Sequence, residues 1–106
     1  MISLYDKYAL KKNITERKLR AAGFINHKYR CYLFKDIIEL QLYIQPEKNM
    51  MWMYEIVDDD YDEVYKAYYD RELGRNEVVK EVDRKLDKVF KTFIKYEIFE
   101  CITNEE

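Results

Sequence analysis

A chain of 106 residues with a formal net charge of −2 has the length of one ordinary domain, spanning 1–106. Its hydrophobic share of 48% is enough for a core without disulfides or metals, and no apolar run approaches the length of a membrane span. The N-terminus lacks the apolar core of a signal peptide, so we expect a cytoplasmic protein.

Tyrosine is the outlier in this composition, because eleven tyrosines help bring the aromatic share to 16%. Tyrosine is enriched where one protein meets another. Charge is also uneven: residues 1–48 carry ten Lys and Arg against five Asp and Glu, whereas residues 49–106 carry nine against sixteen. This split either places opposite potentials on two faces of the fold or lets the two halves attract each other.

The first 13 residues show no clear period, and we expect a short helix or an ordered arm there. Thr15 is a good N-cap for a short helix over residues 16–22. Gly23 stands where such a helix would stop.

Beyond this helix the apolar period changes to two, which predicts four strands at 29–34, 38–45, 50–57 and 64–69. Turn residues at 46–49 and an acidic run at 58–63 separate the last three. Sequential hairpins are the simplest topology that such short connections permit.

A four-residue loop at 46–49 predicts the register of the second hairpin, with Tyr43 opposite Trp52 and Leu42 opposite Met53. The acidic loop then places Val57 opposite Val64. One face of the sheet collects Ile38, Leu40, Leu42, Ile44, Met51, Met53 and Val57. The other face collects Tyr43, Trp52, Tyr54, Ile56, Tyr65 and Tyr69.

The longest periodic segment runs from Asn76 to Phe99 and predicts an amphipathic helix, with Gly74 before it and Asn76 as the N-cap. Its apolar residues are Val78, Val79, Val82, Leu86, Val89, Phe90, Phe93 and Ile94. We therefore expect an α+β fold, a four-stranded antiparallel β-meander with this long C-terminal helix packed on one face and a short N-terminal helix. Residues 1–13 would form an arm and residues 100–106 a tail.

The aromatic outer face is the main candidate surface, because the solvent-facing side of an antiparallel sheet is normally polar. In one interpretation the N-terminal helix and arm cover it, giving a three-layer sandwich with no site. In the second it binds a protein partner or another copy of the chain. In the third it stacks nucleobases, which the acidic strand region disfavours. The candidate partner-binding residues are Tyr43, Trp52, Tyr54, Tyr65 and Tyr69.

A basic segment near the N-terminus supports the alternative function, binding to nucleic acid through phosphate contacts. Its residues are Lys11, Lys12, Arg17, Lys18 and Arg20. The segment lacks the recognition-helix pattern of a helix-turn-helix, so a solvated basic face is the simpler interpretation.

Motifs for catalysis or metal binding are weak in this sequence. The acidic run at 58–63 begins like a calcium loop, but Glu63 stands where Gly is needed and Tyr69 where a bidentate Glu belongs. His27 is the only histidine, and Cys31 and Cys101 lack metal-ligand spacing. We expect no enzyme activity, no cofactor and no metal.

The segments IIELQLYIQ, YEIVDDD and Tyr68–Phe90 (YYDRELGRNEVVKEVDRKLDKVF) together resemble small proteins of phages and mobile elements of Gram-positive bacteria. The resemblance covers about residues 15–99, and its motifs are structural. It implies a bacterial cytoplasmic setting and an interaction directed at a host or defence protein, with no catalytic residue carried over. From the aromatic outer face of the sheet we expect a small non-enzymatic protein-interaction module, as a homodimer or as a binder or inhibitor of a host protein.

Overall fold

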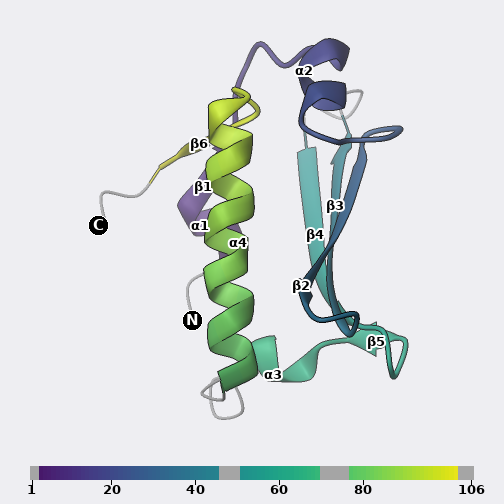
Figure 1. Ribbon diagram of the computed structural model, residues 1–106. Helices are drawn as coiled ribbons and strands as arrows, with labels where there is room; N and C mark the ends of the chain where they lie inside the picture. Colours follow the sequence, from purple (N-terminus) through teal and green to yellow (C-terminus); the bar gives the residue numbers. More distant parts are fainter. Residues whose placement is uncertain (1–2, 46–50, 70–76, 103–106) are drawn as a thin grey trace.

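A four-stranded antiparallel sheet and a long helix dominate the computed structural model, which describes residues 3–45, 51–69 and 77–102 (Figure 1). The elements in chain order are α1 (Leu4–Lys7), β1 (Tyr8–Leu10), α2 (Glu16–Ala21), β2 (Lys28–Phe34), β3 (Ile38–Gln45), β4 (Met51–Asp58), β5 (Glu63–Val64), α3 (Lys66–Tyr69), α4 (Glu77–Lys95) and β6 (Phe99–Cys101). The expected α+β fold is confirmed.

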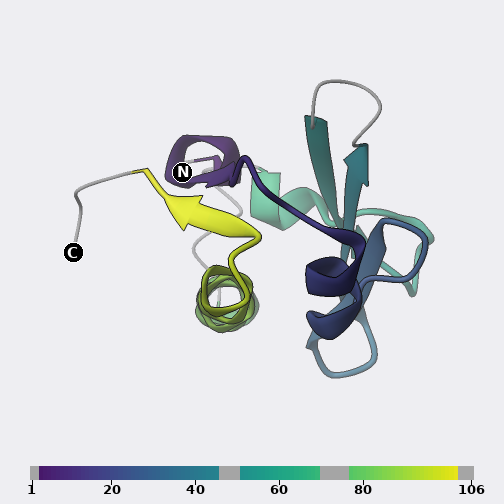
Figure 2. The same ribbon diagram turned by 90° about the horizontal axis from the view of Figure 1, so that it is seen from above.

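The main sheet has the order β2-β3-β4-β5, with every neighbouring pair antiparallel, as a meander requires. The view from above shows α4, α1 and β6 on one side of this sheet (Figure 2). One core lies between the two layers, and it includes Leu40 and Leu42 of β3 and Phe90 and Phe93 of α4.

The helix α4 buries the stripe that its periodicity predicts, namely Val79, Val82, Leu86, Val89, Phe90 and Phe93. Ile94, expected on the same stripe, is 37% exposed. The expected N-cap Asn76 and the preceding Gly74 lie outside the described residues. In α2, the Thr15 hydroxyl accepts a hydrogen bond from the N–H of Lys18 at 3.1 Å, and Gly23 follows with a φ of +102°, so both expected helix ends are confirmed.

The predicted register between β3 and β4 is wrong by one residue. Gln45 opposes Met51 and Leu42 opposes Tyr54, so five residues rather than four separate the paired ends of the strands. Because side chains alternate along a strand, this one-residue shift exchanges the two faces of β4. Trp52, Tyr54 and Ile56 face the core, whereas the methionines on either side of Trp52 face outward. The aromatic outer face is therefore largely absent from the folded protein.

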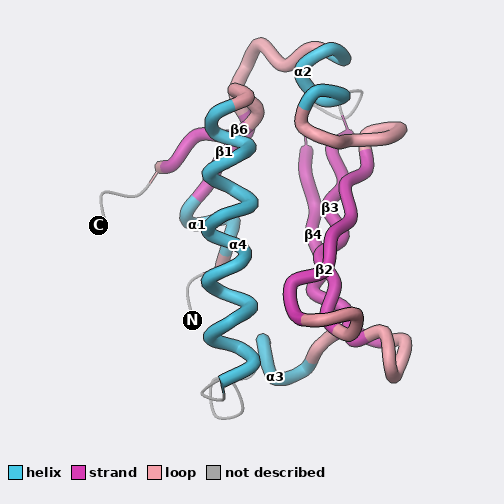
Figure 3. Tube along the Cα trace, viewed as in Figure 1, coloured by secondary structure: helices cyan, strands magenta, loops and turns pink. Residues whose placement is uncertain are grey.

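The predicted fourth strand, 64–69, is wrong over most of its length. Val57 does oppose Val64 as expected, but β5 ends there, and Lys66–Tyr69 form the short helix α3 (Figure 3). The ladder stops here because the C=O of Tyr65 accepts a hydrogen bond from the N–H of Tyr68 at 3.1 Å, while the N–H of Ile56 donates to the Tyr69 hydroxyl.

The expected arm contains β1, and β6 spans the last residue of the expected helix, Phe99, and the first two of the expected tail; the two strands pair with each other, and α4 ends earlier, at Lys95. Tyr8 of β1 opposes Cys101 of β6, and Leu10 opposes Phe99. This two-stranded ribbon lies beside α4, and Trp52 packs against Phe99 with a centroid distance of 4.8 Å. The arm thus covers core-facing aromatic side chains, and the molecule has two layers rather than the three of the sandwich interpretation.

Candidate interaction surface

Among the described residues, no strand pairs with residues 51–55 of β4 on the side away from β3, and we call this side the open edge of β4. Backbone groups of alternate residues in an antiparallel strand point to opposite edges. The C=O of Ile56 accepts from the N–H of Tyr65, and the N–H of Ile56 donates to the Tyr69 hydroxyl at 3.0 Å, both on the side away from β3. The N–H and C=O groups of Trp52 and Tyr54 point the same way, and no hydrogen bond joins them there to any described residue.

The inner side of this edge is lined by aromatic rings that the N-terminal arm holds in place. The Tyr5 ring centroid lies 4.7 Å from that of Trp52 and 5.1 Å from that of Tyr54. The Tyr54 hydroxyl accepts a hydrogen bond from the N–H of Leu4 at 3.3 Å. Tyr5 nevertheless stays 46% exposed, so it presents an apolar ring beside the open backbone groups.

The outer side of the edge carries two exposed methionines. Met51 is 52% exposed and Met53 is 43% exposed. Leu42 and Ile44, whose side chains point to the core side of the neighbouring strand, are only 0% and 2% exposed. Methionine adapts its shape to a partner surface more readily than a branched side chain does. Both sides of the open backbone edge therefore carry apolar side chains that water still reaches.

The five candidate partner-binding residues are divided between two places. Trp52 and Tyr54 belong to the open edge of β4, and Tyr69 lies at its end, where it is 48% exposed. Tyr65, half-buried, adjoins the same end through its hydrogen bond to Ile56. Only Tyr43 lies on the outer face of the sheet, in a different setting.

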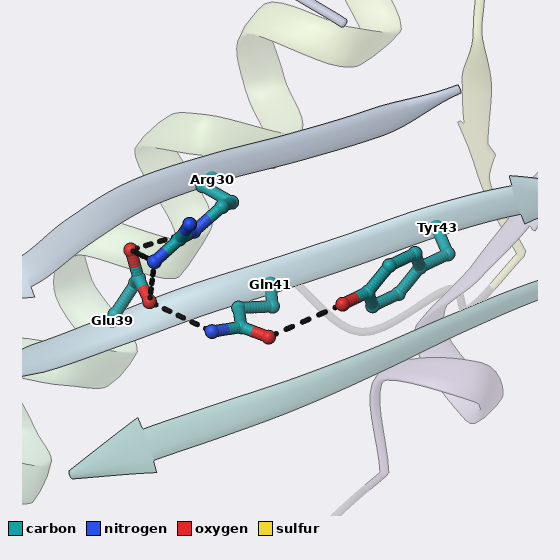
Figure 4. Close-up of polar contacts among 4 residues, drawn as sticks. All are labelled: Arg30, Glu39, Gln41 and Tyr43. Atoms are coloured by element: carbon teal, nitrogen blue, oxygen red, sulfur yellow. Dashed lines mark hydrogen bonds and ion pairs between the residues drawn. The ribbon is translucent and has the colours of Figure 1, made fainter. Parts of the chain in front are cut away.

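The outer face of β3 carries a row of polar side chains joined by hydrogen bonds (Figure 4). Arg30 donates to both carboxylate oxygens of Glu39 at 3.0 Å, Gln41 donates to Glu39 at 2.8 Å, and the Tyr43 hydroxyl donates to Gln41 at 3.3 Å. Burial alone would raise the pKa of Glu39, but the hydrogen bonds from Arg30 and Gln41 outweigh it and hold this pKa below its ordinary value. These groups satisfy one another's hydrogen bonds, so the row is accounted for by contacts within the sheet.

The other outer strand, β2, has features that discourage pairing with a further strand. It carries Lys28 and Arg30 on its outward face, and its register with β3 shifts between Tyr32 and Phe34. Charged side chains and irregular pairing are the usual protection of an exposed sheet edge. Residues 51–55 of β4 include no Lys, Arg or Pro, and their register with β3 is continuous. The two edges of the sheet are therefore chemically different.

The basic candidates do not form a single patch. Lys11, Lys12 and Lys18 line a surface hollow of about 340 Å³ together with Glu97, whose carboxylate lies 3.0 Å from the Lys18 ammonium. The hydrogen bond from Lys18 and its positive charge lower the pKa of Glu97 below its ordinary value. Acidic groups thus already neutralise part of this positive charge.

Arg17 is exposed on α2, and Arg20 lines a second hollow of about 390 Å³ at the end of the same helix. In that hollow, His27 Nε2 lies 2.5 Å from Glu16 Oε1. The two ionisable groups are bonded to each other and do not converge on a common point where a ligand would sit.

The position of Glu55 in the sequence could have revealed the correct register of β4, and with it the open edge. In the predicted register this acid lies on the core side, where an ionised group is costly even with a basic partner. Placing Glu55 outward opposite Gln41, as observed, also brings Trp52 inward. Tyr5, Met51 and Met53 were not among the expected site residues, because an exposed strand edge has no periodic pattern of its own.

Other kinds of site find little support in the structure. Within the described part of the chain, no three His, Cys, Asp or Glu side chains gather in a way that suits a metal ion. None of the helices in residues 3–45, 51–69 and 77–102 has the length and apolar character needed to cross a membrane. The resemblance to phage and mobile-element proteins stays a prediction, because comparisons with protein-family models, curated protein sequences and solved structures found no match.

Proposed function

We propose that this protein is a non-enzymatic protein-interaction module that binds its partner by strand addition at the open edge of β4. The observation that carries the proposal is the pair of outward-pointing backbone groups at Trp52 and Tyr54, flanked by exposed Tyr5, Met51 and Met53. An extended segment added to a sheet edge gains main-chain hydrogen bonds, and side-chain pockets on alternating positions supply specificity. The partner is either a second copy of this chain or a host protein in the expected bacterial setting.

The test is affinity capture from nuclease-treated bacterial lysate with wild-type protein, Met53→Lys and Lys18→Glu as baits. We expect a partner that is retained by the wild type and by Lys18→Glu and lost with Met53→Lys, since a lysine on an edge strand opposes pairing. Retention should persist at about 1 M salt, where the Debye length is only about 3 Å.

The nucleic-acid alternative makes the opposite prediction. Phosphate contacts weaken steeply with added salt, so binding through the basic segment would disappear at high salt and with Lys18→Glu, and Met53→Lys would leave it unchanged. That pattern would replace the strand-addition proposal. The ion pair between Lys18 and Glu97 is the reason we favour the β4 edge.

A further inference from the structure

We infer that the partner at the open edge is a second copy of this chain, whose β4 pairs antiparallel with the first about a two-fold axis at Met53. The inference rests on the proposed function and names its partner. In this arrangement Trp52 of each copy opposes Tyr54 of the other, and the two main sheets become one continuous sheet. The axis is perpendicular to that sheet, so the helical layers of both copies lie on the same side.

The hydrogen-bond pattern of β4 selects this pairing over the alternatives. Outward-pointing backbone groups must face outward-pointing groups of the other strand, which restricts the two-fold axis to a few positions. An axis at Tyr54 would pair Trp52 with Ile56, whose N–H and C=O are already bonded to Tyr69 and Tyr65. An axis at Trp52 would pair Tyr54 with position 50, which precedes the first residue of β4. An axis at Met53 uses both open pairs and leaves the hydrogen bonds of Ile56 in place.

The side chains along β4 are compatible with this pairing on both faces. Trp52 of one copy lies beside Tyr54 of the other on the core side, an aromatic cross-strand pair of the kind that stabilises sheets. On the outer side, the two Met53 side chains meet at the axis. The single charged residue of this segment, Glu55, opposes Met51 of the second copy, so the two like charges stay apart.

The contrast between the two edges of the sheet supports a pairing role for β4. The β2 edge carries two basic residues and a register shift, features that keep strands from adding to it, whereas the β4 edge has a continuous register with β3 and one charged residue, Glu55. The seam is short, so it belongs at the low end of interface sizes, below about 1,200 Å². We therefore expect a reversible dimer with a dissociation constant on the order of micromolar.

Charge exchange at Met53 tests the pairing, because residue 53 meets only its own counterpart. In sedimentation-equilibrium runs across the micromolar range, Met53→Glu and Met53→Lys should each weaken self-association by about tenfold or more, through repulsion of like charges directly opposite. An equimolar mixture of the two variants should recover a dimer, because Glu then faces Lys.

Met51→Lys is the matched control, since it adds the same charge to the same face of the same strand. In the inferred register Lys at 51 faces Glu55 of the second copy, so this variant should dimerise at least as well as the wild type. Thermal melting of each variant checks that it is folded. Because the side chains at positions 51 and 53 are both exposed, we expect neither substitution to unfold the protein.

Cysteine crosslinking gives a second measurement that needs no change of charge. In a background with Cys31→Ala and Cys101→Ala, Met53→Cys should form a disulfide-linked dimer under mild oxidation. A non-hydrogen-bonded antiparallel pair holds its Cα atoms about 4.5 Å apart, within disulfide range. Met51→Cys should stay uncrosslinked, because the two copies of residue 51 would be about 13 Å apart along the seam.

The outcomes separate this inference from the proposed function. If the wild type stays monomeric throughout, or dimerises without regard to residue 53, the second-copy inference is overturned. The strand-addition proposal still stands in that case if lysate capture depends on Met53. If neither self-association nor capture responds to Met53→Lys, both proposals are lost.

Discussion

Glu39 shows how a single charged residue can be held on a sheet face. Its side chain is only 5% exposed although it lies on the outer side of β3, and Arg30 covers it with two hydrogen bonds. A buried acid is tolerated when such bonds replace the water that it loses. The lowered pKa of Glu39 records that the folded state prefers the ionised form.

This preference predicts an acid-sensitive contribution to stability. Because the folded-state pKa of Glu39 is below the unfolded value, its contribution is present above the unfolded pKa and is lost as the pH falls through the lowered one. Glu39→Gln should cost about 1–2 kcal/mol of unfolding free energy at neutral pH, discounted for the exposed Arg30. Urea unfolding at a series of pH values checks this.

The difference between wild type and Glu39→Gln should shrink as the solution becomes acidic. Glu55→Gln is the control, since Glu55 is exposed on the same face of the neighbouring strand. Equal effects of the two substitutions at every pH would show that the Arg30–Glu39–Gln41 row contributes nothing of its own.

At the scale of elements, α4 was predictable because its stripe of apolar residues is long and regular. The same periodicity placed Phe90 in the core, where the structure finds it 0% exposed and stacked on Tyr8 at 4.3 Å. Ile94 lies at the margin of the stripe, about a quarter-turn around the helix from its centre, and is exposed although the adjacent Phe93 is buried.

These two positions give a matched pair of substitutions. Phe90→Ala should lower the unfolding free energy by about 3–5 kcal/mol, because it leaves a large cavity in the core. Ile94→Ala should cost about 1 kcal/mol or less, as is usual for surface positions. A chemical-denaturation midpoint that fell equally in both variants would contradict the observed orientation of α4.

The shorter elements were not predictable from the sequence in the same way. Strand propensity favoured a strand at Val64–Tyr69, yet the C=O of Tyr65 accepts from the N–H of Tyr68 instead of from Ile56, so the ladder ends and α3 follows. The register of β4 depends on the length of one loop, which residue types alone do not determine. An error of one residue in that length placed the expected site on the outer face of the sheet, whereas the structure places Trp52 and Tyr54 at its edge with their side chains toward the core. Where no period exists, as in β1 and β6, only the pairing across the whole chain makes the strands.

For the molecule as a whole, the ribbon of β1 and β6 joins the first described residues to the last. Ile102 donates its N–H to the C=O of Lys7, and Leu4 and Tyr8 of the arm are 4% and 8% exposed within the common core. The residues expected to form an arm are therefore part of the core. The candidate site depends on them, because Tyr5 forms the inner flank of the β4 edge.

Removal of residues 1–10 should destabilise the entire domain. Loss of the buried Leu4 and Tyr8 side chains alone costs about 3–6 kcal/mol by area arguments. The fluorescence of the single tryptophan, Trp52, reports the change. Its emission should shift to longer wavelength once Tyr5 no longer shields the indole ring from water. Tyr61→Ser, at a 75% exposed position of the β4–β5 turn, should leave emission and melting temperature unchanged. An unshifted emission in the truncated protein would mean that the arm does not cover Trp52.

The contact between Trp52 and Phe99 also has a consequence for biosynthesis. Phe99 follows Trp52 by 47 positions, and at about 5–20 residues per second a ribosome needs roughly 2–9 s to add them. During that interval the hairpins of β2, β3 and β4 can form, but the aromatic side that later meets α4 and β6 stays open to water. The nascent chain therefore passes through a stage in which a broad apolar surface is available for chaperone binding. That surface is fully covered only after β6 has left the ribosome.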